Sequence, residues 1–393
     1  MPGAPANERN VLLVTGVAHA ATHFAELMYP TLAVVLVHET GRPFEEVITW
    51  SFAGYLLFGA GALPAGYLAD RIGARRVLLA SLGGVSVGLL LAGLVEPGPA
   101  LAGCFALMGL AASGYHPAGM GLISRTVRAR GRGLAVNGIF GNIGIALTPV
   151  VTAALAETFG VRGALLASGG ALLVLTAVCA ALPLEEPIVE VHPPTVHHGS
   201  RAGRVALIVL CVAAMLGGIS YRGNTLVQPV FFEQQVSFMT FGWTTTLVYL
   251  VGIVGQYLGG MIADRYDLRW SYLAFHAASL PLLLLIGVTQ ELPLVMVAGL
   301  FVLFSLGMQP IENSLFAQLT PDRWRSTGYG LKFVLTFGVG ASAVWIVEAT
   351  KTAHGLAAVF PVLAGVVSLL VLTIIVLVVV MGPTRSAPVA ELP

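Results

Sequence analysis

Apolar residues along the chain gather in long runs that are separated by short polar or charged stretches. Twelve such runs lie near residues 11–37, 47–69, 77–95, 100–124, 133–157, 162–182, 205–232, 241–263, 270–289, 292–316, 327–349 and 354–381. Most of them reach the length of about 20 apolar residues that a helix needs to cross a bilayer. Because lipid offers no hydrogen-bond partner to an open backbone, runs of this length predict helices and not strands.

The composition agrees with a protein that lies in a lipid bilayer. Apolar residues make up 56% of the chain and charged residues only 10%, against about 25% charged residues in typical soluble proteins. Mean hydropathy is +0.87. The first run is longer than the apolar core of a signal peptide and follows a segment without the usual basic stretch, so it predicts a retained first span. The three cysteines lie in apolar runs and predict neither a disulfide framework nor a zinc site.

One connection differs from the others. Residues 183–204 are polar, contain prolines and show no helical periodicity, so they predict a linker. We therefore expect three parts: a six-helix bundle over 1–182, the linker over 183–204 and a second six-helix bundle over 205–393. His192, His197 and His198 lack the ordered spacing of a metal site, and we interpret them as solvated linker residues.

The cations are unevenly distributed between the two sides. The loops after every second run and the two termini hold fifteen of the 20 Lys and Arg residues, and the opposite loops hold only Arg42, Arg162 and Lys351. Since Lys and Arg favour the cytoplasmic side, we expect both termini and the linker in the cytoplasm and the spans in the inner (plasma) membrane. The last two cations, Arg222 and Lys332, fall inside apolar runs, so no basic patch is left for nucleic acid.

Two charged hairpins occur at matching places in the two halves. Gly66-Tyr67-Leu68-Ala69-Asp70-Arg71-Ile72-Gly73-Ala74-Arg75-Arg76 follows the second run, and a looser copy over 260–270 begins 194 positions later. Gly114-Tyr115-His116-Pro117 similarly aligns with Gly307-Met308-Gln309-Pro310. A repeat of six spans in parallel orientation is typical of transporters that rock one half against the other.

The segment 66–76 resembles the signature loop between helices 2 and 3 of the major facilitator superfamily, G-x-L-A-D-R-x-G-R-[RK], and departs from it only at Ala74. The resemblance covers essentially the whole chain. It implies an all-α membrane protein with twelve transmembrane helices in two pseudo-symmetric six-helix halves, and we expect a monomer. It also implies a gating role for Asp70 and Arg71 and for Asp264 and Arg265 in the second copy. The expected partners of the two Asp residues are the positive N-termini of the eleventh and fifth spans, or nearby Arg.

A narrower resemblance is to the fosmidomycin-resistance group of drug exporters, and it implies proton-coupled efflux by antiport. Tyr115-His116-Pro117 resembles the aromatic-His-Pro motif of that group, and Gly141-Asn142-Ile143-Gly144 with Pro149 resembles its Gly-Asn-x-Gly-x(4)-Pro stretch. Two features depart from the pattern. Ala118 and Gly119 stand where the group carries an acid, and His19 is followed four residues later by His23 instead of Asp.

Four charged residues fall well inside the apolar runs: Glu26, Arg222, Glu312 and Lys332. A charge at the bilayer centre costs at least about 2.5 kcal/mol, so such residues usually face a cavity or an opposite charge. We expect Glu312 and Lys332 to form a mutual ion pair with a structural or gating role, with Gln309 and Asn313 close by. For Arg222 two roles stay open: binding a carboxylate or phosphate with its planar fork, or pairing with Glu26 across the bundle.

His19, His23 and Glu26 lie at i, i+4 and i+7 and therefore share one face of the first helix. A carboxyl group at this depth binds protons more readily, and His titrates near neutral pH. We expect Glu26 and His23 to couple transport to protons and all three to contact substrate. A hydrogen-bonded cluster that only locks the helices together is the structural alternative. The remaining substrate-binding candidates are polar residues inside spans: His116, Asn137, Asn142, Arg222, Asn224, Gln228, Gln309 and Asn313.

These observations favour a secondary active transporter for a small polar or anionic organic solute. The partners would be that solute, protons and the lipid bilayer, with no cofactor. An alternative is a transporter of divalent transition metals that uses His19, His23 and Glu26 as ligands. The sequence lacks a P-loop, a nucleophile elbow and an H-E-x-x-H motif, so an enzyme is not expected.

Overall fold

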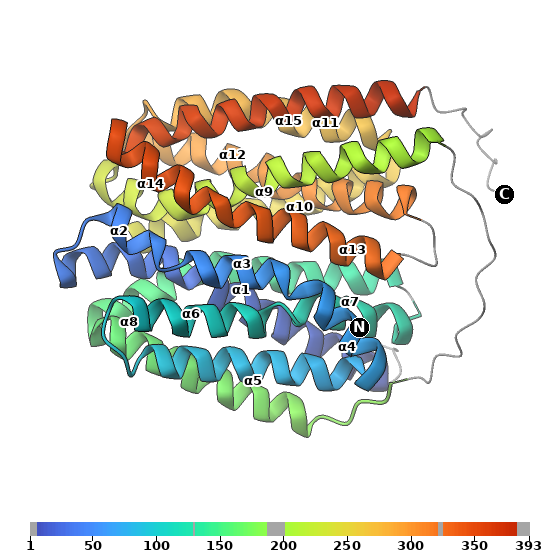
Figure 1. Cartoon of the computed structure of the whole chain (residues 1–393), viewed down its shortest axis with the longest axis horizontal. Coiled ribbons are helices and arrows are strands. Elements are labelled where there is room, and N and C mark those ends of the chain that lie inside the picture. Colours follow the sequence, from blue (N-terminus) through green and yellow to red (C-terminus); the bar gives the residue numbers. More distant parts are fainter. Residues whose placement is uncertain (1–5, 129, 187–200, 321–324, 383–393) are drawn as a thin grey trace.

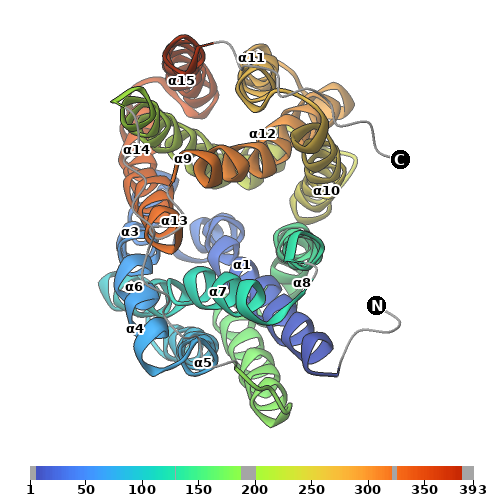
Figure 2. The same cartoon turned by 90° about the vertical axis from the view of Figure 1, so that its right-hand side faces the viewer.

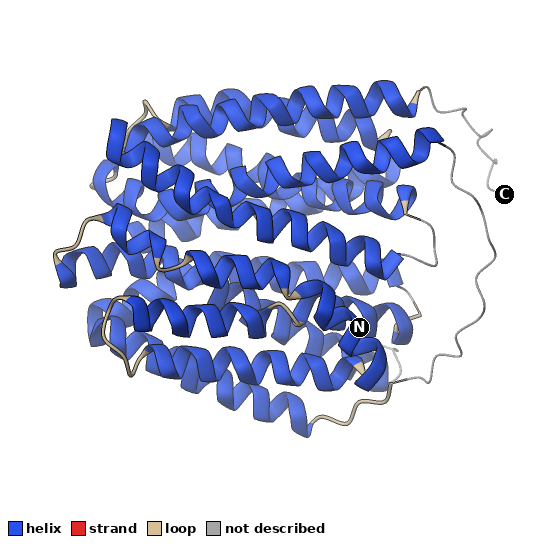
Figure 3. Cartoon of the chain, viewed as in Figure 1, coloured by secondary structure: helices blue, strands red, loops and turns tan. Residues whose placement is uncertain are grey.

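The fold is described by a computed structural model that covers residues 6–128, 130–186, 201–320 and 325–382, and these residues contain helices and no strands (Figure 3). The N-terminal helices are α1 (Ala6–Thr40), α2 (Phe44–Thr49), α3 (Phe52–Ala60), α4 (Ala62–Ile72), α5 (Ala74–Ala92), α6 (Pro99–Ala112), α7 (Tyr115–Thr126) and α8 (Arg130–Ala181). The C-terminal helices are α9 (Arg201–Gln235), α10 (Phe241–Arg265), α11 (Leu268–Ile286), α12 (Glu291–Leu319), α13 (Arg325–Phe333), η2 (Val334–Val339), η3 (Gly340–Ser342), α14 (Ala343–His354), η4 (Leu356–Ala358) and α15 (Val359–Met381).

Nine helices in the described ranges are long and apolar enough to cross a membrane, or ten when the bent pair formed by α2–α3 and α4 is counted as one span. The 52-residue α8 covers two of the predicted runs and contains a non-helical residue, Gly160, with φ 69° and ψ 173°. A positive φ favours glycine, so the chain turns here between the fifth and sixth runs. Together α6 and α7 cover the fourth run. The twelve predicted runs are therefore all helical.

Three predicted spans are broken instead of continuous. The second bends by 44° at Gly61, between α3 and α4. The fourth is divided at Ser113 and Gly114, and Pro117 lies in the first turn of α7, where its missing N–H leaves no hydrogen bond unmade. The eleventh passes through a π-helical turn, η2, and a short 3₁₀ turn, η3, before it continues as α14. The apolar pattern gave no sign of these breaks, because hydrophobicity continues through them.

The helices form two groups, which we name the N-terminal bundle (α1–α8) and the C-terminal bundle (α9–α15). Figures 1 and 2 show the two groups lying side by side with their long helices roughly aligned. Across the interface α1 contacts α9, α3 contacts η2, and α8 contacts α10. A Cβ atom on Gly59 of α3 would lie 2.0 Å from the backbone nitrogen of Gly338 in η2. The bundles therefore touch backbone to backbone at this point.

Helix α1 is enclosed by protein more completely than the other spans. In its most apolar window 78% of the residues are buried, against 33–50% in the other long helices. A helix surrounded by protein can carry polar side chains that a lipid-facing helix cannot. The three polar residues predicted to share one face of the first helix lie on α1.

Candidate functional site

A buried ion pair joins the two bundles near the middle of α1 and α9. The Nη2 group of Arg222 donates a hydrogen bond to Oε1 of Glu26. Both side chains are almost fully buried, with 1% and 2% of their surface exposed. The pair that the sequence left open as one role for Arg222 is therefore present, and it connects residues 196 positions apart.

The Arg222 guanidinium retains unused hydrogen-bonding capacity. Its Nε and Nη1 atoms are buried and have no hydrogen-bond partner, and its Cζ lies 3.6 Å from the centre of the Tyr55 ring. A guanidinium over an aromatic face gains a cation–π attraction. Tyr55 was not among the predicted site residues, because a single Tyr in an apolar run carries no pattern that separates it from core aromatics.

His23 contacts the Glu26 side of this pair, and two further histidines lie next to His23. Nδ1 of His23 lies 2.7 Å from Oε2 of Glu26, and Nδ1 of His19 lies 2.8 Å from the carbonyl oxygen of Asn137. The His19 ring lies 4.9 Å from that of His23 and 5.3 Å from that of His116, measured between ring centroids. The structure thus brings together the predicted residues of α1 and the predicted His of α7.

His116 also reaches the opposite bundle. Its ring stacks on Phe333 of α13, with ring centroids 4.5 Å apart. Tyr115, the preceding residue, stacks on His19 at 4.7 Å and donates from its hydroxyl to Oδ1 of Asn137 at 2.9 Å. Tyr115 lies in the quoted Gly-Tyr-His-Pro motif, and that motif is the signal that could have assigned it to the site.

The predicted metal set of His19, His23 and Glu26 is not the set that the fold assembles. Glu26 has one carboxylate oxygen on Arg222 and the other on His23. The group whose donor atoms converge in the described part of the chain is His19, His23 and His116. Spacing along one helix could not reveal that His116, on another helix, takes the place of Glu26. Transport of a metal as cargo is not favoured.

The predicted amides near this centre are buried, and several of their polar atoms are unpaired. Asn137, Asn142, Asn224 and Gln228 are at most 3% exposed. The amide of Asn142 donates to the carbonyl of Gly138 at 3.2 Å. Both polar atoms of the Gln228 side chain, Oδ1 of Asn224 and Oδ1 of Asn142 have no hydrogen-bond partner. Such groups are expected where a ligand or water supplies the missing partner.

A second buried ion pair lies within the C-terminal bundle. Nζ of Lys332 is 2.8 Å from Oε1 of Glu312 and 2.5 Å from Oδ1 of Asn313. The hydroxyl of Tyr272 donates to the other Glu312 oxygen at 2.6 Å. The expected mutual pair of Glu312 and Lys332 is confirmed, whereas Tyr272 on α11 was missed. Gln309 is separate from this network and accepts from Gln256 on α10 at 2.7 Å.

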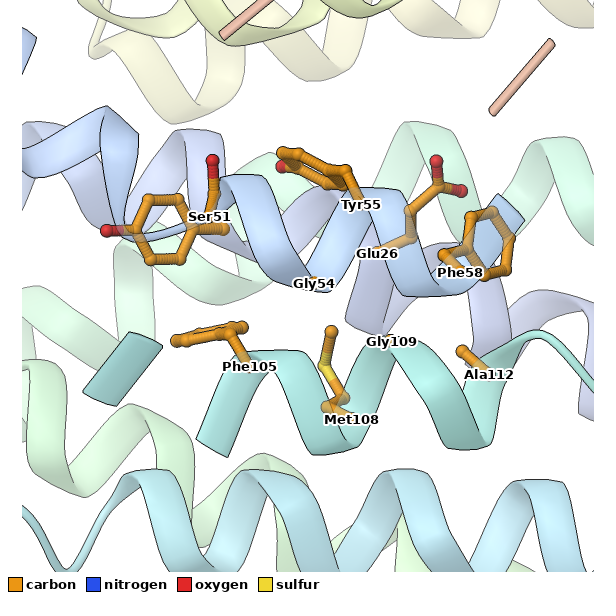
Figure 4. Close-up of a pocket in the computed structure, with 10 residues that line it drawn as sticks. Glu26, Ser51, Gly54, Tyr55, Phe58, Phe105, Met108, Gly109 and Ala112 are labelled. Carbon is orange, nitrogen blue, oxygen red and sulfur yellow. The ribbon is translucent and has the colours of Figure 1, made fainter. Parts of the chain in front are cut away.

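Space around the central pair is small in this conformation. A cavity of about 10 Å³ lies between α1, α3 and α6, which is room for about one water molecule. Figure 4 shows Glu26, Tyr55 and Phe58 on one side of it and Phe105 and Met108 of α6 on the other. Arg222 itself is only 1% exposed, so a solute can reach it only after the surrounding helices move.

The gating candidates lie at the end of the molecule that carries the α4–α5 hairpin. Asp70 accepts from Nη2 of Arg125 at 3.1 Å, so its observed partner is a nearby Arg. The Arg71 guanidinium stacks over Tyr67 at 4.5 Å, and Asp264 and Arg265 are exposed at the end of α10. The turn before the eleventh span, the other expected partner of Asp70, lies outside the described residues.

The opposite end of the molecule holds two ion pairs between the bundles. His38 of α1 pairs with Glu233 of α9, and Lys351 of α14 pairs with Glu45 of α2 at 2.5 Å. Beside them lies a cavity of about 470 Å³ between α1, α2, α9 and α14. These pairs connect the two bundles at that end.

Residues 15–219 match the Major Facilitator Superfamily. The chain belongs to this family. Transporters among the solved structures share its fold at low sequence identity. A POT family transporter in complex with 5-aminolevulinic acid aligns with a TM-score of 0.78, 14% identity and 96% of each chain covered. A bacterial homologue of the human lysosomal transporter Spinster aligns with TM-scores of 0.70 in its inward-facing unoccupied form and 0.68 in its inward-facing occupied form, at 13% and 14% identity over 96% of each chain. No curated protein matches the sequence.

Membership of the superfamily confirms the predicted fold and the assignment to a transporter. The chain is a multi-pass membrane protein of the superfamily, and its family indicates a transporter and not an enzyme. The narrower resemblance to fosmidomycin-resistance exporters stays a prediction.

Proposed function

We propose that this transporter moves a small anionic organic solute across the inner membrane by alternating access, coupled to protons. The ion pair between Glu26 and Arg222 supports the proposal best. It lies at the interface of the bundles, and Arg222 keeps two buried donor groups without a partner. A planar guanidinium with free donors matches a carboxylate or phosphate group.

The proton and the anion are coupled through one shared residue. An anion that binds Arg222 competes with Glu26 for the same cation. Glu26 then has a buried charge with less compensation, which favours proton uptake. A proton on Glu26 in turn frees Arg222 for the solute. When the anion and the proton are both bound, the ion pair of Arg222 with Glu26 is replaced by an ion pair of Arg222 with the anion. The net charge of the site is then unchanged, which limits the free-energy cost of burying charge in a low-dielectric interior.

Alternating access requires gates at both ends, and charged contacts occur at each. At the end opposite the hairpin, the pairs of His38 with Glu233 and Lys351 with Glu45 link the two bundles. At the hairpin end, Asp70 contacts Arg125 within the N-terminal bundle. The excess of Lys and Arg at the hairpin end supports a cytoplasmic location for that end and for both termini. The resemblance of the 115–117 and 141–149 segments to drug exporters favours export as the direction, by a monomer.

The neighbouring amides complete a polar lining for the solute. Asn224 and Gln228 follow Arg222 on α9 and have unpaired atoms, as does Asn142 on α8. The POT family structure holds 5-aminolevulinic acid, so a protein of this fold accommodates a small organic acid.

The test is solute-driven proton movement in proteoliposomes that contain the purified protein. A panel of small organic anions and cations is first screened by thermal shift, and the stabilising compounds are then assayed for transport. Anions should stabilise the protein, Arg222→Gln should abolish that stabilisation, and Glu26→Gln should bind solute but fail to move protons. Arg162→Gln and Glu96→Gln alter exposed residues and are the matched controls. Stabilisation by cations alone, or proton coupling that survives Glu26→Gln, would overturn the proposal.

A further inference from the structure

Three imidazole rings converge inside the N-terminal bundle, and we name His19, His23 and His116 the histidine cluster. One ring nitrogen of each lies within 4.8 Å of a ring nitrogen of both others. The ring centroids are 4.9, 5.3 and 5.4 Å apart, which makes a nearly equilateral triangle. The first two residues come from α1 and the third from the start of α7.

The hydrogen bonds of two of these rings define their tautomers. A carbonyl oxygen only accepts, so Nδ1 of His19 carries the proton that it donates to Asn137 at 2.8 Å. Nδ1 of His23 donates to the Glu26 carboxylate at 2.7 Å in the same way. In the neutral ring Nε2 is then an acceptor with a free lone pair. Nε2 of His19 and Nε2 of His116 are both buried without a hydrogen-bond partner.

We infer that the histidine cluster binds a divalent transition-metal ion such as Zn²⁺ or Co²⁺. Three imidazoles whose ligating nitrogens lie about 2.1 Å from a tetrahedrally coordinated ion have ring centroids about 5 Å apart. The centroids of the histidine cluster are separated by similar distances. The contacts of His19 with a carbonyl and of His23 with a carboxylate are those that orient metal-binding histidines elsewhere, because a bond at Nδ1 directs Nε2 to the ion.

The surroundings of the cluster favour a bound ion over a transported one. All three ligands lie in one bundle, so rocking of the bundles does not open or close the ligand set. Glu26 keeps its contacts with Arg222 and His23 and is not needed as a ligand. The fourth position would be left to water, as in open zinc sites.

The experiment measures Co²⁺ binding to the detergent-solubilised full chain by calorimetry and by the visible absorption of four-coordinate Co²⁺. The parent protein carries an affinity tag that contains no histidine. It also carries the linker substitutions His192→Ala, His197→Ala and His198→Ala, because linker histidines can themselves bind cobalt. We expect one Co²⁺ per chain with the absorption of a four-coordinate ion. His116→Phe preserves the stack on Phe333 and should weaken binding about tenfold or more.

Two controls separate this inference from the proposed function. His276→Ala removes a buried histidine of the C-terminal bundle and should leave Co²⁺ binding unchanged. Glu26→Gln keeps an acceptor for Nδ1 of His23, so it should retain the ion while losing proton coupling. His19→Gln provides a second ligand deletion if His116→Phe does not fold. Absence of bound cobalt in the parent, or equal binding in the parent and both ligand variants, would overturn the inference whatever the transport assay shows.

Discussion

Arg222 of α9 donates to Glu26 of α1, and this buried pair ties the two bundles together near the middle of both helices. Its partners are 1% and 2% exposed, so neither charge is solvated by bulk water. Loss of one partner of such a pair leaves an uncompensated buried charge, which costs about 3–5 kcal/mol. Replacement of both charges avoids that cost.

A double-mutant cycle on this pair should therefore be strongly non-additive. Arg222→Gln and Glu26→Gln should each lower the stability of the folded protein by up to about 3–5 kcal/mol, and the double variant should be more stable than the less stable single variant. Thermal unfolding in detergent measures the effect, with Glu96→Gln as the exposed control. Additive losses would show that the two side chains act independently.

The pair of Glu312 and Lys332 should prove structural. Lys332 contacts Glu312 and Asn313, and Tyr272 occupies the other Glu312 oxygen, so the network is satisfied within one bundle. Lys332→Gln should lower stability by about 3–5 kcal/mol because Glu312 loses its cation. Affinity for the solute, measured by calorimetry, should not change. A stable Lys332→Gln protein with lost solute binding would place Lys332 in the binding site instead.

The sequence predicted the fold well because a membrane span is a local property. Twelve apolar runs, their connections and the charged hairpin can be read without knowing which helices touch, and the helices lie where those runs are. Helix breaks were missed, since η2 and the 113–114 break depend on close packing near glycine and not on hydrophobicity.

The sequence predicted how polar residues are arranged along one helix, but not which residues meet across helices, and their roles stay predictions. The face shared by His19, His23 and Glu26 follows from helical spacing. Arg222 was identified because charged residues are rare inside the apolar runs. Tyr55 beneath Arg222 depends on how α3 meets α9, which spacing within one segment does not encode. Tyr272 escaped notice for the same reason, because its partner Glu312 lies on α12.

Asp267 should stabilise the start of α11 in a pH-dependent manner. Its carboxylate accepts from the backbone N–H of Arg269 at 2.9 Å and from the guanidinium of the same residue. The hydrogen bonds from the Arg269 side chain lower the pKa of Asp267 below its usual 3.8. A depressed carboxyl pKa contributes stability that is present above the unfolded-state pKa and is lost as pH falls through the folded-state pKa.

Asp267→Ala should therefore cost about 1 kcal/mol at neutral pH, the usual value of a helix N-cap. The difference in melting temperature from the parent should shrink below about pH 4. Asp264→Asn, which changes an exposed acid at the same end, is the control. A difference that is constant down to the lowest pH would mean that the carboxylate charge contributes nothing.

The two ion pairs opposite the hairpin end should bias the conformation. Glu233→Gln and Glu45→Gln each remove a contact between the bundles, with His38 and Lys351 respectively. Pairs of this exposure are worth about 0–1 kcal/mol each, so each change should shift the population toward opening at that end by up to about fivefold. A cysteine at Val230, which lines the adjacent cavity, should react faster with maleimide in a cysteine-free background. Glu46→Gln is the matched control because its partner Arg42 belongs to the same bundle.

Gly59 should be intolerant of any side chain in this conformation. A Cβ atom there would lie 2.0 Å from the backbone nitrogen and 2.5 Å from Cα of Gly338, and backbone atoms cannot move aside as a flexible side chain can. Gly59→Ala should therefore separate α3 from η2 and destabilise the closed interface by about 1–3 kcal/mol. Gly103→Ala provides the control, since it is also a helical glycine but has no atom within 4 Å of the added Cβ. Thermal unfolding and maleimide labelling at Val230 report the result. An unchanged melting temperature and labelling rate would mean that the bundles do not meet at Gly59.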